Sequence, residues 1–346
     1  MVLMGTSSQI FLFAEGPPRQ SVLCVTAVTA GTGSQVQYGK QGEWFMNARA
    51  IPVLPAIRLK HILYTTDFSE PSRTALPIVA AIARKYGSHV FAAHVWPPLP
   101  FTMMPPKALS SLDGKEEQDA RDLLETFVRI KEFEGLPVTP ILRCGDAARE
   151  LDRIVRQQRI DLVVLSTHGR SGFKRLLMGS VAEKLFRNLP CPVLTVGPNV
   201  SARFKTQSEV KEILFPTDLS HESGAVFPHL AALATENSAR ITMLHVEPRE
   251  DRRHPAAMDE PDVLQNAMER MFCAQVSPRC EVRLVVESGD PAERILARAR
   301  ADNTDLIGFG VRNTGEISSH FRNTIPYKVV LESECPVLTA HIRDGL

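Results

Sequence analysis

The sequence has no long hydrophobic run, no excess of charge of either sign and no paired cysteine motif. None of its apolar runs approaches the roughly 20 residues that a membrane-spanning helix needs, which excludes a membrane-spanning function. Forty Lys and Arg residues face 39 Asp and Glu residues, for a formal charge of +1. The strong positive field of nucleic-acid-binding proteins and polybasic membrane anchors is therefore missing. We expect neither a nucleic-acid partner nor a membrane partner.

The six cysteines stand singly along the chain. None has the C-x-x-C or Cys–His spacing of a zinc or redox site, so we predict no metal site. Reduced thiols in a cytoplasmic protein are the simplest interpretation, and the first residues lack the basic segment of a secretory signal. Cys191 precedes Pro192 and is predicted to serve packing rather than redox chemistry.

The first 57 residues differ in composition from the rest of the 346-residue chain. They are rich in Gly, Ser, Thr and Gln and show no sustained helical or strand period. Gly39-Lys40 briefly suggests a phosphate loop, but the spacing and the following hydroxyl of a P-loop are missing. We predict a poorly ordered extension over residues 1–57. An over-extended gene start is the alternative, because Met46 lies just before the ordered pattern.

The remainder of the chain contains an internal repeat. The blocks that recur in order are 62–69 as 213–220, 94–95 as 245–246, 145–146 as 289–290, and 191–195 as 335–339. The spacing is 151 residues for the first two blocks (67 to 218) and 144 residues for the last two (191 to 335). One shortened connection explains the difference. We predict a first domain over 58–198, a linker over 199–208 and a second domain over 209–342.

Each repeat alternates predicted strands with predicted helices. In the first repeat the strands are 62–66, 90–95, 138–142, 162–165 and 192–196. Apolar positions at helical spacing mark the intervening helices, namely Leu76, Val79, Ala80 and Ala83, then Ala120, Leu123, Leu124 and Phe127, then Leu151, Ile154 and Val155, with a last helix after Gly179. This alternation predicts the α/β class, with two tandem doubly wound parallel sheets in Rossmann-like or flavodoxin-like order. Pro137 and Pro140 place strand 138–142 at an edge. Ligands of such sheets bind at the carboxyl ends of the strands.

The richest stretch for chemistry is 166–180, which follows a buried strand and opens a helix. Gly169, Gly172 and Gly179 allow close backbone approach to a ligand. Arg170, Lys174 and Arg175 add three positive charges, and Ser180 begins a helix whose positive dipole end attracts anions. The stretch predicts a polyphosphate cradle. Two alternatives stay open: Ser180-Val181-Ala182-Glu183 also fits a capping box that needs no ligand, and the basic residues also fit a solvated loop.

Three features together resemble the universal stress protein family: Thr66-Asp67, His94-Val95, and Ser166-x2-Gly169-x9-Gly179-Ser180. The resemblance covers both repeats. It implies a nucleotide site in which Asp67 and the Val95 backbone face adenine and ribose, while Gly169, Gly179 and Ser180 hold the phosphates. Ser166 stands where the family signature has glycine. The full predicted set is Thr66, Asp67, Val95, Ser166, His168, Gly169, Arg170, Gly172, Gly179 and Ser180. His94 is predicted to be a buried core histidine, and capping of the next turn is the alternative role of Asp67.

The second repeat carries a degenerate version of this site. Its predicted residues are Thr217, Asp218, Val246, Gly310, Asn313, Asn323 and Thr324. Asn313 and Asn323 replace two glycines, and the loop charge falls from +3 over 169–180 to 0 over 313–324. Pro326 removes a donor from the first turn of the following helix. We predict that the first repeat binds nucleotide and the second binds it poorly, with a phosphate-poor adenosine ligand left open.

The resemblance implies an ATP-binding stress-response protein that acts as a sensor or adaptor. Mg²⁺ would accompany the phosphates and be held mainly by their oxygens. The last strands, 192–196 and 336–341, would pair within the chain like a fused dimer, and a homo-oligomer and an unknown protein partner are further expectations. No general base or nucleophile is visible, so at most slow ATP hydrolysis is expected. The alternative is an interaction protein without nucleotide. An adenylate-transferring enzyme is disfavoured, because its His-x-Gly-His and Ser-Gly-Gly-x-Asp-Ser patterns are missing.

Overall fold

The computed structural model describes residues 23–25, 59–97, 106–167, 178–205, 209–247, 266, 268, 272, 280–311 and 324–341. The chain divides into two compact units. We call residues 58–208 with 312–346 the 58–208 unit, and residues 1–57 with 209–311 the 209–311 unit. No helix in the described ranges is long and apolar enough to cross a membrane.

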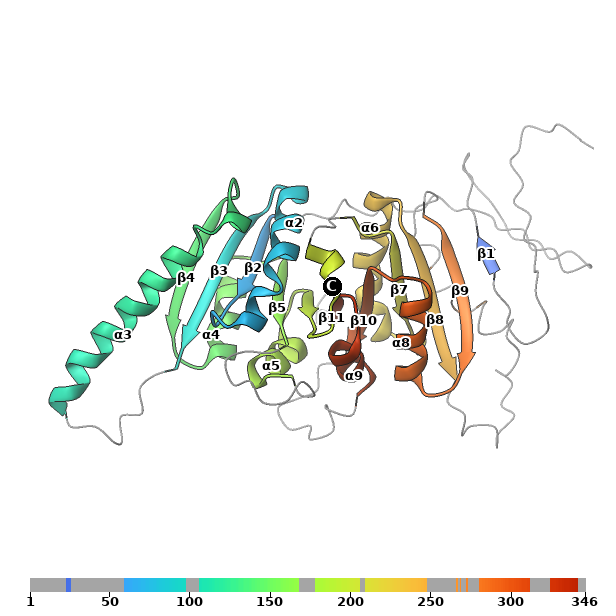
Figure 1. Cartoon of the computed structure of the whole chain (residues 1–346). Coiled ribbons are helices and arrows are strands. Elements are labelled where there is room, and N and C mark those ends of the chain that lie inside the picture. The colour runs from blue at the N-terminus through green and yellow to red at the C-terminus, as the bar shows by residue number, and fades with distance from the viewer. Residues whose placement is uncertain are drawn as a thin grey trace, which may run out of the picture. The chain divides into compact units, whose positions relative to one another are not determined.

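The 58–208 unit is built on a sheet whose strands are mostly parallel. Its strands are β2 (His61–Thr65), β3 (His89–Trp96), β4 (Val138–Cys144), β5 (Leu162–Ser166), β6 (Val193–Val196) and β11 (Val337–His341). Its helices are α1 (Glu70–Arg73), α2 (Leu76–Tyr86), α3 (Pro106–Phe127), η2 (Lys131–Phe133), α4 (Ala147–Gln157), α5 (Ser180–Asn188), η3 (Ala202–Lys205) and α9 (Ile325–Glu332). The strands of the first repeat lie in the order β4-β3-β2-β5-β6 (Figure 1). This is the Rossmann-like order of the two that the sequence predicted, and it reverses between β2 and β5.

The helices of this unit bury the apolar positions that mark them in the sequence, except for the half-buried Ala120 and the exposed Leu123 of α3. In α2 the four predicted positions are buried, and the helix ends at Gly87 in the left-handed conformation, with φ of 63°. In α3, Leu124 and Phe127 are buried while Leu123 is 43% exposed. The prediction that Leu123 faces the core was wrong. Adjacent helical residues point about 100° apart, and only the face with Leu124 and Phe127 packs on the domain.

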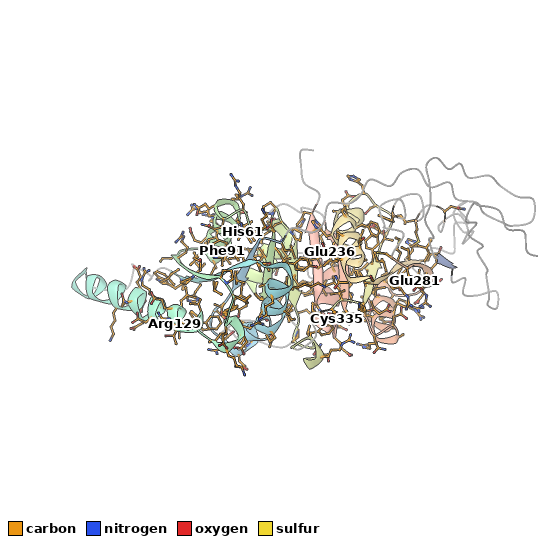
Figure 2. The ribbon with its side chains drawn as sticks, turned by 90° about the horizontal axis from the view of Figure 1, so that it is seen from above. His61, Phe91, Arg129, Glu236, Glu281 and Cys335 are labelled. Carbon is orange, nitrogen blue, oxygen red and sulfur yellow. The ribbon has the colours of Figure 1, made fainter. Side chains whose placement is uncertain are left out.

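The two ends of this sheet differ in chemistry. At the amino-terminal end, His61 and Phe91 lie on neighbouring strands β2 and β3 with ring centroids 5.6 Å apart (Figure 2). His89 stacks on Phe91 at 4.6 Å and bonds Thr139 Oγ1 at 2.7 Å. Aromatic packing therefore closes this end. The carboxyl end carries the polar residues of the candidate site.

The 209–311 unit repeats the arrangement. Its strands are β1 (Leu23–Val25), β7 (Glu212–Pro216), β8 (Arg240–Glu247), β9 (Val282–Ser288) and β10 (Leu306–Val311), and its helices are η4 (Ser223–Val226), α6 (Phe227–Asn237) and α8 (Pro291–Ala301). The strands lie in the order β1-β9-β8-β7-β10. From β9 to β10 this matches the first repeat, while β1 adds to β9 in the antiparallel direction. The rest of the predicted N-terminal extension lies outside the described residues.

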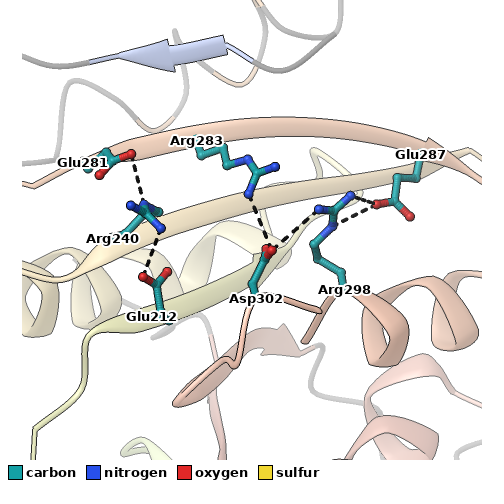
Figure 3. Close-up of polar contacts among 7 residues, drawn as sticks. All are labelled: Glu212, Arg240, Glu281, Arg283, Glu287, Arg298 and Asp302. Atoms are coloured by element: carbon teal, nitrogen blue, oxygen red, sulfur yellow. Dashed lines mark hydrogen bonds and ion pairs between the residues drawn. The ribbon is translucent and has the colours of Figure 1, made fainter. Parts of the chain in front are cut away.

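Ion pairs link the strands of the 209–311 unit to each other and to α8 (Figure 3). The Arg240 guanidinium contacts Glu212 and Glu281, each at 3.0 Å. Burial raises the pKa of Glu212, and Arg240 opposes that shift. Asp302 lies between two further arginines (Figure 3). Its Oδ1 is 3.5 Å from Arg283 Nη1 and 3.7 Å from Arg298 Nη1. Arg298 also pairs with Glu287, so each carboxylate drawn in Figure 3 contacts an arginine.

The two last strands pair, as the sequence predicted, and both lie in the 58–208 unit. β11 runs antiparallel to β6, with Leu338 opposite Leu194. Leu194 and Leu338 are equivalent in the repeat, so the pairing is centred on a local two-fold relation. The partners on either side are Val337 with Thr195 and Thr339 with Val193. This pairing explains why residues after 311 belong to the same compact unit as the first repeat, although their sequence belongs to the second.

One difference between the repeats is compensated in the core. A side chain on Gly308 in β10 would place its Cβ 2.5 Å from Leu230 Cδ1 in α6. The equivalent residues of the first repeat are Val164 and Val79, both fully buried. The second repeat thus has a smaller residue on the strand, Gly308, and a larger one on the helix, Leu230, so the smaller strand residue is compensated by the larger helix residue.

We expect Gly308→Val to destabilise the protein by roughly 1–3 kcal/mol, because overpacking forces side chains out of their rotamers. The double variant Gly308→Val/Leu230→Val, which restores the pair of the first repeat, should recover most of the loss. Urea denaturation of both variants measures this. A double variant no more stable than Gly308→Val alone would show that the two positions do not compensate.

Candidate functional site

The turn after β2 fixes the carboxylate of Asp67 at the carboxyl end of the sheet. Thr66 is buried, and its N–H donates to the Ala93 carbonyl at 3.0 Å. Asp67 Oδ1 accepts from the Ser69 N–H at 3.0 Å and from the Ser69 hydroxyl at 2.5 Å. Phe68, between them, has a φ of 64°, which non-glycine residues rarely adopt. Asp67 thus caps this turn, which the sequence offered as the alternative to a nucleotide contact.

The neighbouring strand β3 contributes the support for this turn. The buried His94 ring bonds the Thr66 carbonyl at 2.8 Å, and its centroid lies 4.4 Å from that of Phe68. The prediction of a buried core histidine is confirmed. Val95 follows, half-buried, with its backbone in register with Arg143 of β4. Thr66, Asp67 and Val95 therefore share the same end of adjacent strands.

Ser166 ends β5 on the other side of the point where the strand order reverses. The β2–β5 register pairs Ile62 with Leu162 and Tyr64 with Val164, which brings Ser166 alongside Thr66. Ser166 is half-buried. Four predicted residues of the following loop lie outside the described residues, namely His168, Gly169, Arg170 and Gly172. The described part of the site thus occupies the position where doubly wound sheets bind ligands.

The start of α5 lies at the end of β5. Gly179 is the N-cap residue, with φ of −61° and ψ of 148°, and as a glycine it makes no side-chain cap bond. The capping-box prediction was wrong, because Ser180 is the first helical residue rather than the cap. The Gly179 N–H donates to the Thr167 carbonyl at 2.8 Å. Ser180 is exposed, and it lies at the positive dipole end of the helix.

The second repeat reproduces the turn closely. Asp218 Oδ1 accepts from the Ser220 N–H at 3.0 Å and from its hydroxyl at 2.6 Å, and Leu219 has a φ of 62°. Burial raises the pKa of Asp218, but the bonds from Ser220 and Ser223 outweigh it and hold the pKa below its usual value. His245 bonds the Thr217 carbonyl at 2.9 Å. The turn is therefore present in both repeats.

Gly310 was predicted to belong to the degenerate nucleotide site of the second repeat, and in the structure it packs against the chain's own backbone. It stands where the family signature has its first glycine, but a Cβ there would lie 2.0 Å from the Glu222 carbonyl oxygen and 2.5 Å from that of Ser223. The chain's own 3₁₀ helix η4 occupies the space beside it. In the first repeat the equivalent residue is Ser166. The glycine at 310 is thus explained by packing inside the 209–311 unit.

A tyrosine accounts for the difference between the repeats at this point. The Tyr64 hydroxyl donates to the Ser72 carbonyl at 2.8 Å. Burial raises the pKa of Tyr64, so the hydroxyl stays protonated and keeps donating. The second repeat has Phe215 in its place, and the equivalent carbonyl, that of Ser223, packs against Gly310 instead.

The remaining predicted residues of the second repeat are only partly described. Val246 is half-buried in β8, and Thr324 is the N-cap of α9 with no side-chain cap bond. Asn313 and Asn323 lie outside the described residues. Among the residues that are described, no group of three or more His, Cys, Asp or Glu side chains could hold a metal ion.

Sequence reasoning missed the serines that build both turns. Ser72 Oγ bonds Thr66 Oγ1 at 3.1 Å, and Ser223 Oγ bonds Thr217 Oγ1 at 2.9 Å. The signal was available, because Ser72 and Ser223 are 151 residues apart, as Asp67 and Asp218 are. Tyr327, discussed below, was also missed.

The comparisons with known proteins agree with this geometry. The model of the universal stress protein family matches residues 58–197 and again residues 209–341. The chain belongs to the universal stress protein family. Its two family domains follow each other in tandem, and both are α/β with mostly parallel strands.

Several universal stress proteins are similar to this chain. The universal stress protein MJ0531 of Methanocaldococcus jannaschii is 32% identical over 141 residues, which are 40% of this chain and 81% of that protein. MJ0577 of the same organism is 26% identical over 156 residues, 41% of this chain and 96% of that protein. The crystal structure of a universal stress protein from Archaeoglobus fulgidus has a TM-score of 0.63 at 20% identity, covering 84% of this chain and 98% of that one. This last likeness shows the tandem fold.

Proposed function

We propose that the first repeat binds ATP at the carboxyl end of its sheet, and that the protein acts in stress responses as a nucleotide-dependent sensor or adaptor. The observation that supports this proposal is that two features lie at the carboxyl end of the sheet, where the strand order reverses between β2 and β5. One is the Asp67 carboxylate, fixed by Ser69 at 3.0 and 2.5 Å. The other is the start of α5, where the N-cap residue Gly179 contributes no capping side chain.

The chemistry of these two features suits the two ends of ATP. A carboxylate accepts hydrogen bonds from a ribose hydroxyl or the adenine amino group. The amino-terminal end of α5 attracts phosphate through its N–H groups and dipole. Within the described residues, a Cβ on Gly179 would contact the Thr167 carbonyl oxygen at an ordinary 3.5 Å. Mg²⁺ would be held chiefly by phosphate oxygens. We propose at most slow hydrolysis.

We further propose that the two repeats differ in ATP binding and that the protein acts in a reducing compartment. The second repeat keeps its turn but has the sequence 313–324 without net charge, so we expect it to bind ATP weakly or not at all. The six cysteines stand singly along the sequence, so we also propose a reducing compartment such as the cytoplasm. A nucleotide-free adaptor is the competing function.

A matched pair of variants tests the proposal. Asp67→Ala and Asp218→Ala remove the same two serine bonds from equivalent turns, so each should lose a similar stability of about 1 kcal/mol. Calorimetric titration with ATP should give at least about tenfold weaker binding for Asp67→Ala and unchanged affinity for Asp218→Ala. Equal losses in both variants would contradict the assignment to the first repeat. No binding by the unmodified protein would favour the nucleotide-free adaptor.

A further inference from the structure

A tyrosine from the second repeat contacts the segment that leads into α5. The N–H of Met178 donates to the Tyr327 hydroxyl at 3.0 Å. Both residues are 3% exposed, so water does not replace this bond. Met178 directly precedes Gly179, the N-cap residue of α5. The contact joins residues 149 positions apart in the sequence, within the 58–208 unit.

Among the described residues, two hydrogen bonds hold the chain where it enters α5. One comes from the first repeat itself, from the Gly179 N–H to the Thr167 carbonyl at 2.8 Å. The other comes from Tyr327 on α9. Loss of the hydroxyl would leave the buried Met178 N–H without this acceptor, and a buried unsatisfied donor is costly. The segment would then move to find another partner, and the N–H groups at the start of α5 would move with it.

The position of Tyr327 depends in turn on how α9 packs on the first repeat. The Asn199 side chain donates to the Leu331 carbonyl of α9 at 3.1 Å. Gly197 lies so close to α9 that a Cβ there would be 2.4 Å from the Val330 carbonyl oxygen. The chain after α9 forms β11, which pairs with β6. The hydroxyl is thus held in place by the pairing of the two last strands.

We propose that Tyr327 is a positioning residue for the phosphate end of the first repeat's nucleotide site, so that the second repeat completes this site. The inference rests on the proposed function, since it assigns the start of α5 to the phosphates. In this inference the pairing of β6 with β11 supports the binding site, because it holds α9 and Tyr327 against Met178. Nucleotide binding and the docking of α9 should then be coupled, because each stabilises the same placement of Met178.

The test compares Tyr327→Phe with Thr339→Val. The phenylalanine keeps the buried ring and removes only the hydroxyl. Thr339→Val is the control, because the Thr339 hydroxyl contacts the Val193 carbonyl at 3.4 Å in the same β6–β11 pairing and does not reach Met178. For Tyr327→Phe we expect ATP binding to weaken about five- to tenfold while adenosine binding stays constant, because only the phosphate end is displaced. Thr339→Val should change neither affinity.

Each outcome bears on the inference. Equal ATP affinity for Tyr327→Phe and the unmodified protein overturns it and leaves the proposed function intact. Equal losses of ATP and adenosine affinity indicate a general structural role and also overturn it. No ATP binding by the unmodified protein overturns both. If Tyr327→Phe fails to fold, amide hydrogen exchange of the unmodified protein decides: ATP, but not adenosine, should slow exchange around both Met178 and Tyr327, and unchanged exchange at α9 contradicts the coupling.

Discussion

Replacing Gly310 by serine, the residue at the equivalent position of the first repeat, is expected to destabilise the 209–311 unit by roughly 3 kcal/mol, the upper end of overpacking costs. The added Cβ would lie 2.0 Å from the Glu222 carbonyl oxygen and 2.5 Å from that of Ser223. Both atoms belong to backbone, so no side-chain rotation relieves the clash and the start of η4 must move. Because Ser223 also bonds Thr217, the turn that holds Asp218 should be distorted as well.

Chemical denaturation measures this loss, and Ser166→Gly is the matched control. That variant removes a side chain at the equivalent strand end, where the cost should be limited to the roughly 0.5–1 kcal/mol that glycine costs through backbone entropy. A Gly310→Ser protein as stable as the unmodified one would show that η4 has room to shift. The packing explanation of Gly310 would then fail.

Gly179→Asp is expected to abolish ATP binding without loss of stability. The backbone of Gly179, with φ of −61° and ψ of 148°, suits aspartate, which is among the best N-cap residues and should stabilise α5 by a few tenths of a kcal/mol. The new carboxylate would stand where we place the phosphates. Two like charges about 4 Å apart near a protein surface repel by about 4 kcal/mol, so ATP affinity should fall by about 100-fold or more.

Thermal unfolding and ATP titration of the same variant separate the two effects. Thr324→Asp is the control, since Thr324 is the N-cap of α9 and also makes no side-chain cap bond. It adds the same charge at the corresponding helix end of the second repeat and should leave ATP affinity unchanged. If Gly179→Asp still bound ATP with full affinity, the phosphates would have to lie away from α5.

Much of the fold could be predicted because it is encoded locally. The buried strands are short apolar runs, and the positions 76, 79, 80 and 83 of α2 have the spacing of one helix face and are all buried. Leu123 was misplaced because it lies beside Leu124 in the sequence, and the helical period alone does not decide which of the two packs on the sheet. The three-residue strand β1 has no sequence signal, since so short a strand depends on the edge of β9 that it joins.

The candidate site was predictable where one repeat could be compared with the other. The Asp67 and Asp218 turns share their residues and their geometry. Gly310 could not be interpreted correctly, because its neighbours in space, Glu222 and Ser223, lie some 90 residues earlier in the chain. The contact between Met178 and Tyr327 is still less accessible to sequence reasoning. It exists only because β11 pairs with β6 and brings α9 onto the first repeat.

The measurement that tests the central claim most directly is the number of ATP molecules bound per chain, determined by calorimetric titration of the full-length protein in the presence of Mg²⁺. A stoichiometry close to one, with an affinity at least about tenfold weaker in Asp67→Ala and unchanged in Asp218→Ala, is the result that a competent first repeat and a degenerate second repeat predict. Two molecules per chain would contradict the asymmetry between the repeats. The absence of any binding would contradict the nucleotide site itself.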